Sequence, residues 1–116
     1  MKPQIYFLVE WSVTSGNEDA FQALASKAIA RVKANEPGAT EYAWHFTADR
    51  RTCKIVESYL DSAAVLLHLS DVADIVNELS RIALTSRFEV FGNVSLEAQV
   101  ALEGIGAVVT GKWNGL

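Results

Sequence analysis

Along the chain, short stretches in which every second residue is apolar alternate with longer stretches in which apolar residues recur at helical spacing. This order predicts a succession of strands and helices. The stretch "IYFLVEWSV" at 5–13 is rich in β-branched and aromatic residues and predicts a strand. Every second residue from Ile5 to Val13 is apolar, which gives this strand one continuous apolar face. Tyr6 and Leu8 make the other face apolar as well, so we expect both faces of the strand to be covered.

The next stretch, "SGNEDAFQALASKAIARVKANEPG", predicts a helix with marked ends. Asn17 is a candidate N-cap, two acids follow it, and the Glu-Pro-Gly step at 36–38 stops the helix. Two alternating stretches then follow, "TEYAWHFT" at 40–47 and "TCKIVESYL" at 52–60, with a polar turn between them. They predict a β-hairpin.

The stretch after the hairpin, "DSAAVLLHLSD", predicts a short apolar helix over 62–69 that Asp61 caps and that contains His68. A second helical segment follows Ser70, with apolar residues at helical spacing: Val72, Ile75, Val76, Leu79 and Ile82. The remaining elements are a strand at 86–94, a short helix at 95–104 with Ser95 as its cap, and a fifth strand or tail at 107–113.

This order, β-α-β-β-α-β with a C-terminal extension, predicts an α+β fold with a ferredoxin-like antiparallel sheet. We expect a single domain over 1–116, with a core at about 4–94 and an extension at 95–116. Two helices cover only one face of such a sheet. The apolar residues on the other face therefore predict a homodimer in which two sheets face each other.

Composition excludes several classes of partner. The chain has 116 residues, half of them hydrophobic, and a net charge of −4 without a basic run. This balance argues against nucleic acid or an anionic membrane surface as a partner. No segment has the length of a membrane span, and the N-terminus does not resemble a signal peptide. The single cysteine, Cys53, favours a reducing cytoplasm.

Cofactor sites are not predicted either. The two histidines and the single cysteine are far apart and do not have the spacing of a metal site. The chain also lacks a glycine-rich phosphate loop. We therefore expect a protein without a metal or nucleotide cofactor.

One long segment, "NEPGATEYAWHFTADRRTCKIVESYLDSAAVLLHLS", resembles the antibiotic biosynthesis monooxygenase (ABM) family of dimeric α+β barrels. The similarity lies in the Glu-Pro-Gly step, an aromatic residue four positions later, and a strand that ends in Glu-x-aromatic. An Asp-x-x-Ala step and a histidine on a helix follow. The similarity is clearest over 35–71. Two features differ from the family pattern: Tyr59 stands where many relatives have Trp, and 95–116 extends past the usual last strand.

The resemblance implies a homodimer in which each protomer has a pocket between its sheet and its helices. Some family members oxidise electron-rich aromatics or quinols with O2 and without metal or flavin. Others isomerise or degrade small ketones, and one branch opens haem. A haem-opening site needs an axial histidine with an asparagine and a tryptophan in set places, and this sequence does not match that set.

His68 is the first candidate catalytic residue. It shares a helical face with Ala64 and Leu67. One interpretation is a packed histidine with hydrogen-bond partners. The other is a neutral imidazole that faces the pocket and exchanges a proton with a phenol or enolate.

Glu57 and Tyr59 are the other catalytic candidates, and they lie on one face of their strand. An unpaired buried carboxylate is costly, so Glu57 needs a partner. It either pairs with a cation or backbone amide for structure, or it orients His68 or a substrate hydroxyl. Tyr59 either donates a hydrogen bond to a carbonyl or packs by its ring.

Four further residues are candidates for substrate contact. Trp44 and Phe46 share one face of their strand, where they either belong to the core or form a wall for the ligand. His45 points away from them, and Tyr6 is the fourth candidate. Glu10 is expected at an exposed dimer rim.

The function that these observations favour is a cofactor-independent monooxygenase that oxidises an electron-rich aromatic or quinol. In this hypothesis His68, with Glu57 or a water relay, removes a proton from the substrate. The alternatives are a non-catalytic dimer that binds a small ligand or a partner protein, and an isomerase that acts through an enol.

Overall fold

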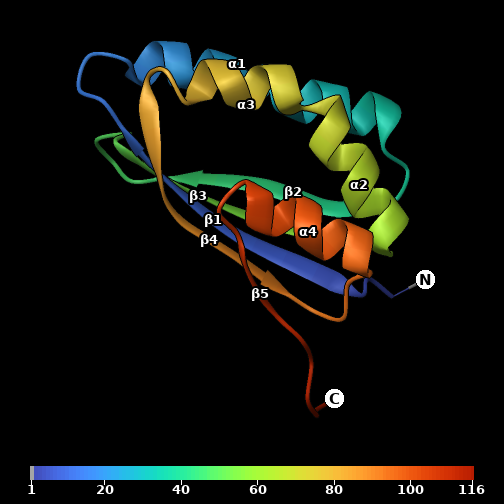
Figure 1. Cartoon of the computed structure of the whole chain (residues 1–116). Helices are drawn as coiled ribbons and strands as arrows, with labels where there is room; N and C mark the ends of the chain where they lie inside the picture. The colour runs from blue at the N-terminus through green and yellow to red at the C-terminus, as the bar shows by residue number, and fades with distance from the viewer. Residues whose placement is uncertain (1) are drawn as a thin grey trace.

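The computed structural model describes residues 2–116, in which four helices lie on one face of an open five-stranded sheet (Figure 1). In chain order the elements are β1 (Ile5–Val13), α1 (Glu18–Asn35), β2 (Ala39–Phe46), β3 (Thr52–Tyr59), α2 (Ser62–Asp71), α3 (Ala73–Leu79), β4 (Ala83–Phe91), α4 (Leu96–Gly104) and β5 (Val108–Thr110). The strand order is β2-β3-β1-β4-β5, antiparallel except for the parallel pair β4–β5. The predicted α+β, ferredoxin-like arrangement is therefore confirmed.

The helix caps are only partly as predicted. Asp61 begins α2 and accepts a hydrogen bond from the Ala64 backbone N–H at 2.9 Å. Ser95 likewise begins α4 and accepts from the Ala98 N–H at 3.2 Å. Asn17 occupies the N-cap position of α1, as predicted, but its side chain accepts no capping hydrogen bond.

Strand β4 begins at Ala83, three residues before the predicted start. Its pairing with β1 explains this, because it runs from Val13 opposite Ala83 to Tyr6 opposite Phe91. Gly92 then ends the strand with a φ of 129°, and a Cβ there would lie 2.5 Å from the Gln4 carbonyl oxygen. A residue with a side chain does not fit this close approach.

The two faces of the sheet differ in cover. On the covered face, the apolar alternate positions of β1 are buried beneath the helices: Ile5, Phe7, Val9, Trp11 and Val13. No helix within residues 2–116 covers the opposite, open face, where Tyr6, Leu84 and Phe91 are exposed. Within the same residues, no helix is both long and apolar enough to cross a membrane.

Candidate functional site

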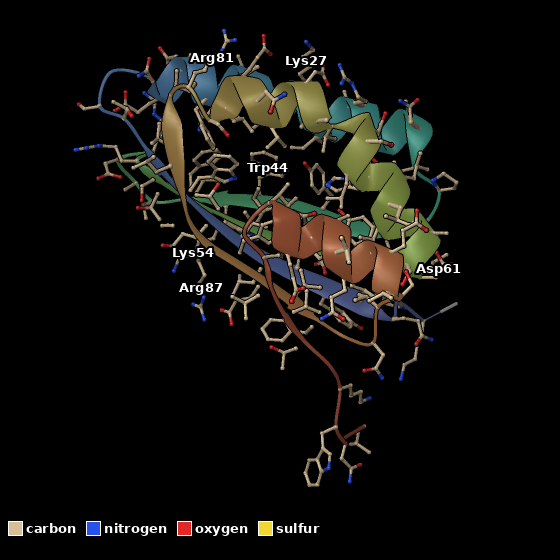
Figure 2. The ribbon with its side chains drawn as sticks, in the orientation of Figure 1. Lys27, Trp44, Lys54, Asp61, Arg81 and Arg87 are labelled. Atoms are coloured by element: carbon tan, nitrogen blue, oxygen red, sulfur yellow. The ribbon has the colours of Figure 1, made fainter. Side chains whose placement is uncertain are left out.

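A cavity of about 510 Å³ lies between the covered face of the sheet and helices α2, α3 and α4. Most of its wall is apolar, with Phe7 and Ile55 from the sheet and Ile75 and Leu79 from α3 among the lining residues. Figure 2 shows the labelled Trp44 side chain in this space, between β2 and the helices. Such an enclosed apolar space with a few polar groups is typical of a small-molecule site.

Glu57 provides the carboxylate of this cavity. It lies on β3, which is between β1 and β2 in the sheet. Glu57 is opposite Phe7 of β1 and Tyr42 of β2. The Tyr59 hydroxyl donates a hydrogen bond to Glu57 Oε1 at 2.5 Å, and both side chains are buried. No group within residues 2–116 donates a hydrogen bond to Glu57 Oε2. This second oxygen is therefore the one available to a ligand.

His68 lies between two buried carboxylates. It is 4% exposed, and its Nδ1 donates to Glu36 Oε1 at 2.9 Å. On the other side of the ring, Nε2 is 3.3 Å from Glu57 Oε1. The ring of Tyr42 packs against the imidazole edge to face, with 5.2 Å between the ring centroids. The four side chains Glu36, His68, Glu57 and Tyr59 thus form one continuous polar chain in an otherwise apolar region.

The Glu-Pro-Gly step explains how Glu36 reaches His68. Gly38 lies so close to α2 that a Cβ on it would be 2.6 Å from the Ala64 Cβ. The Gly38 carbonyl also accepts a hydrogen bond from the Leu60 N–H at 2.9 Å. Ala64 and His68 are one helical turn apart and share a face of α2. Packing of the step on Ala64 therefore brings Glu36 against the imidazole.

Burial and charge shift the pKa values of these groups together. Burial raises the pKa of the Glu57 and Glu36 carboxyls above their ordinary values, although His68 opposes this rise. Burial alone lowers the pKa of His68, but the hydrogen bond to Glu36 and the charge of Glu57 outweigh it, so the pKa is raised. Burial, followed by the charge of Glu57, also raises the pKa of Tyr59. The pKa values of all four side chains, Glu36, His68, Glu57 and Tyr59, are therefore raised, which favours their protonated forms.

The pKa of His68 is raised, mainly because its hydrogen bond to Glu36 and the charge of Glu57 outweigh burial. With one carboxylate on each side, the surroundings favour the protonated ring over the neutral imidazole of the sequence-based interpretation. The predicted helical face was also partly wrong, because Leu67 is 44% exposed whereas His68 shares its buried side with Val65. Glu57 lines the cavity with His68 beside it, so the geometry suits Glu57 as a proton acceptor.

The predicted substrate contacts separate into two groups. Trp44 lines the cavity, and its Nε1 is buried without a hydrogen bond to any of residues 2–116. Phe46 is on the same face but packs edge to face on Phe21, 5.8 Å away, and does not line the cavity. Tyr6 and His45 lie on the open face, so they do not reach this cavity.

Sequence reasoning missed Glu36 and Tyr42 as members of the site. Glu36 was assigned only to the end of the first helix, yet it is 5% exposed and bound to His68. Tyr42 entered only as the aromatic residue that follows the Glu-Pro-Gly step, although the alternation that places Trp44 at the cavity places Tyr42 there too. A buried glutamate beside a proline-glycine turn has no comparable signal in the sequence.

The site consists of proton donors and acceptors rather than metal ligands. Within the described chain, no group of three or more His, Cys, Asp or Glu side chains has the arrangement of a metal-ion site. Cys53 is a buried free thiol whose pKa burial raises to about 12, so it is not a nucleophile at neutral pH. The arrangement suits removal of a proton at Glu57 beside a stabilising cation.

Comparison with known proteins identifies the family. The model of the antibiotic biosynthesis monooxygenase family matches residues 5–73, more than half of the chain. The chain belongs to this family. No match was found among the curated proteins. The family resemblance predicted from the Glu-Pro-Gly step and the helical histidine is therefore confirmed.

Solved structures of other ABM-like proteins show the same fold. MupZ from Pseudomonas fluorescens is 21% identical, with a TM-score of 0.80 over 99% of this chain and 94% of that one. A candidate antibiotic biosynthesis monooxygenase from Bacteroides thetaiotaomicron is 16% identical, with a TM-score of 0.66 over 81% of this chain and 90% of that one. PA3566 from Pseudomonas aeruginosa is 15% identical, with a TM-score of 0.64 over 83% and 97%. At these identities the likeness concerns the fold alone.

Proposed function

We propose that this ABM-family protein is a cofactor-independent monooxygenase that oxidises an electron-rich aromatic, such as a quinol or anthrone, with O2. The observation that best supports this proposal is the chain Glu36–His68–Glu57 at an apolar cavity. A carboxylate whose pKa is raised by burial is a stronger base, and it operates near neutral pH when a cation keeps it ionised. The family name is consistent with this chemistry.

In the proposed reaction, Glu57 Oε2 removes a proton from the substrate, and the imidazolium of His68 stabilises the resulting anion. The anion transfers one electron to O2, and the organic radical and superoxide then combine to form a carbon–oxygen bond. Protonation of this peroxide and loss of water leave a carbonyl on the substrate. For the CH2 group of an anthrone, one atom of O2 becomes the new carbonyl oxygen, and the other leaves as water with the two hydrogens of that CH2 group.

The cavity wall favours a neutral substrate. No lysine or arginine is among the lining residues, and the charged groups that reach the cavity are Glu57 and His68. A substrate with a phosphate or carboxylate would enter without a cation to pair it, which is costly in an apolar space. The buried indole N–H of Trp44 offers a donor to a neutral carbonyl or hydroxyl oxygen.

Oxygen consumption by the purified protein tests the proposal. We expect uptake with at least one member of a panel of quinols, anthrones and flavonols, and its loss in a His68→Ala variant. A His45→Ala variant, altered on the open face, serves as the matched control and should retain the uptake. Turnover of an enol substrate without oxygen uptake would contradict the proposal and identify an isomerase. Binding without turnover would identify a ligand-binding protein.

We also propose that the protein acts as a homodimer through the open face of its sheet. Apolar side chains cross this face on neighbouring strands, and several are more than 40% exposed: Tyr6, Leu84, Phe91 and Val108. Glu10 and Lys54, 3.6 Å apart, form a charged pair beside them. An apolar centre with charged neighbours is typical of an interface between protein copies.

Size-exclusion chromatography with light scattering tests the dimer. Leu84→Asp should shift the protein from twice the chain mass to a single chain mass, whereas Val100→Asp on α4 should not. A wild-type protein that elutes at a single chain mass contradicts the dimer.

We also propose a reducing cytoplasmic location, because Cys53 is a free buried thiol. Cell fractionation tests this location.

A further inference from the structure

Helix α4, from the C-terminal extension, contributes directly to the cavity wall. Its residues Ala98 and Leu102 are fully buried and anchor the helix in the core. The Ser95 N–H, just before α4, donates to Ser62 Oγ on α2 at 2.8 Å and fixes the helix start. Ala101 and Ile105 then line the cavity. Figure 1 shows α4 on the helix-covered side of the sheet.

The residues of the extension lie at the outer part of the cavity. The reacting groups Glu57 and His68 are among its buried lining residues. Ala101 is half-buried and Ile105 is 57% exposed. Other exposed lining residues include the neutral and polar Asn77, Ser80 and Thr85. The cavity therefore runs from a buried proton-transfer end to an outer end whose wall includes α4.

The extension lies outside the part of the chain that the family model matches. That model ends at residue 73, and several solved neighbours match about four-fifths of this chain. MupZ covers 99% of it. The match to the ABM family therefore does not depend on α4, which nevertheless contributes to the cavity wall of this chain.

We propose that α4 determines the length of the substrate. In this proposal the reacting ring lies at Glu57 and His68, and the apolar remainder of the substrate extends along α4 toward the outer end. Ala101 provides the room, because its side chain is a single methyl group on the wall. The inference rests on the proposed function for the position of the reacting ring, but the length limit concerns binding and does not require oxidation.

Binding of 4-ethylphenol and 4-octylphenol to Ala101→Phe and Val100→Phe variants tests this proposal. Val100 is the neighbouring residue, 63% exposed on α4, so it is a matched control for the same substitution. Dissociation constants are measured by quenching of Trp fluorescence, since Trp11 and Trp44 line the cavity. The exposed Trp113 is replaced by Phe in every protein to remove its background.

We expect Ala101→Phe to raise the dissociation constant of 4-octylphenol by about tenfold or more, because its alkyl chain reaches α4. The dissociation constant of 4-ethylphenol should rise by less than about twofold, because its alkyl chain is too short to reach α4. Val100→Phe should change neither. Equal weakening of both phenols, no change in either, or no binding of either to the parent protein would overturn the inference. If Ala101→Phe does not fold, Ile105→Trp is the second variant, because it narrows the same outer end from an exposed position. It should also weaken the binding of 4-octylphenol more than that of 4-ethylphenol.

The same titrations separate this inference from the proposed oxidation. A length preference that Ala101→Phe removes supports α4 as the limiting wall even if no oxygen is consumed. Oxygen uptake without any length preference would support the proposed function and contradict the role of α4.

Discussion

A glutamate and a histidine can be compared on each side of the sheet: Glu57 and His68 on the covered side, and Glu10 and His45 on the open side. On the covered side, Glu57 and His68 are 3% and 4% exposed and lie 3.3 Å apart. On the open side, Glu10 is 3.6 Å from the exposed Lys54, and His45 is exposed with its Nδ1 3.1 Å from the Lys54 carbonyl oxygen. On the open side, therefore, the histidine is exposed to solvent. On the covered side, the glutamate and the histidine are buried and contact each other.

Burial decides which of these pairs can perform chemistry. Exposed ion pairs in water are weak, since solvent screens both charges. A buried carboxylate and imidazole interact strongly, and neither can relax into water. The covered face therefore concentrates proton transfer in a small apolar space. Variants made in matched pairs, one on each face, test this contrast.

The largest expected effect is on turnover in Glu57→Gln. The amide keeps the shape of the side chain but cannot take a proton, so oxygen uptake should fall by roughly a thousandfold, within the range of general-base catalysis. Glu10→Gln on the open face should remain within about twofold of the parent. Comparable losses in both variants would show that the two faces do not differ as described.

The next effect is on stability in His68→Leu. Removal of the imidazole leaves Glu36 and Glu57 buried without their cation, which should lower the free energy of unfolding by roughly 3 kcal/mol at pH 7.5. The loss should be smaller at pH 5, where the carboxyls can be protonated. Urea unfolding measures both values. His45→Leu is the control and should cost less than about 0.5 kcal/mol.

A third prediction concerns the stability of the parent protein as pH changes. The pKa values of Glu36, Glu57 and His68 are all raised in the folded state, so above about pH 5 the folded protein holds more protons than the unfolded chain. Its stability should therefore fall as the pH rises toward the folded pKa values, by roughly 1.4 kcal/mol per pH unit for each extra proton held. Thermal unfolding from pH 5.5 to 8 measures this trend, and a rise in stability would contradict it.

The smallest expected change is a shift of the pH profile in Glu36→Gln. The profile of kcat should lose activity at high pH as the His68 imidazolium loses its proton. Without the negative charge of Glu36, the pKa of His68 should fall, so this alkaline limb should move to lower pH by roughly one unit. Glu41→Gln, altered at an exposed position of β2, is the control. If Glu36→Gln loses activity at the same pH as the parent protein or at a higher pH, Glu36 does not raise the pKa of His68.

Much of the fold could be predicted because it depends on local pattern. The alternation in β1 correctly grouped Phe7 with the other apolar residues of one face, and the alternation in β3 put Glu57 and Tyr59 on one face. Asp61 correctly marked the start of α2. The start of β4 could not be predicted from its own residues, since it follows from pairing with Val13 of β1. Local pattern thus determines the face of a residue, whereas strand limits depend on the partner.

The site was less predictable, because its central contact joins residues far apart in the sequence. Glu36 and His68 are 32 positions apart and meet only because Gly38 packs against Ala64. The rise in the pKa of His68 depends on this contact and on Glu57, so it could not be predicted from the sequence around His68. His45 and Tyr6 were included as candidates for substrate contact, but their strand parity places them on the open face.

The most direct test of this contrast is the protonation state of the His68 ring. A His45→Asn variant leaves His68 as the only histidine, so a long-range ¹H–¹⁵N NMR spectrum contains the signals of this ring alone. At pH 7.5 the structure predicts an imidazolium, with protons on both ring nitrogens held between Glu36 and Glu57. The spectrum of a neutral tautomer at this pH, in the folded protein, would contradict the account.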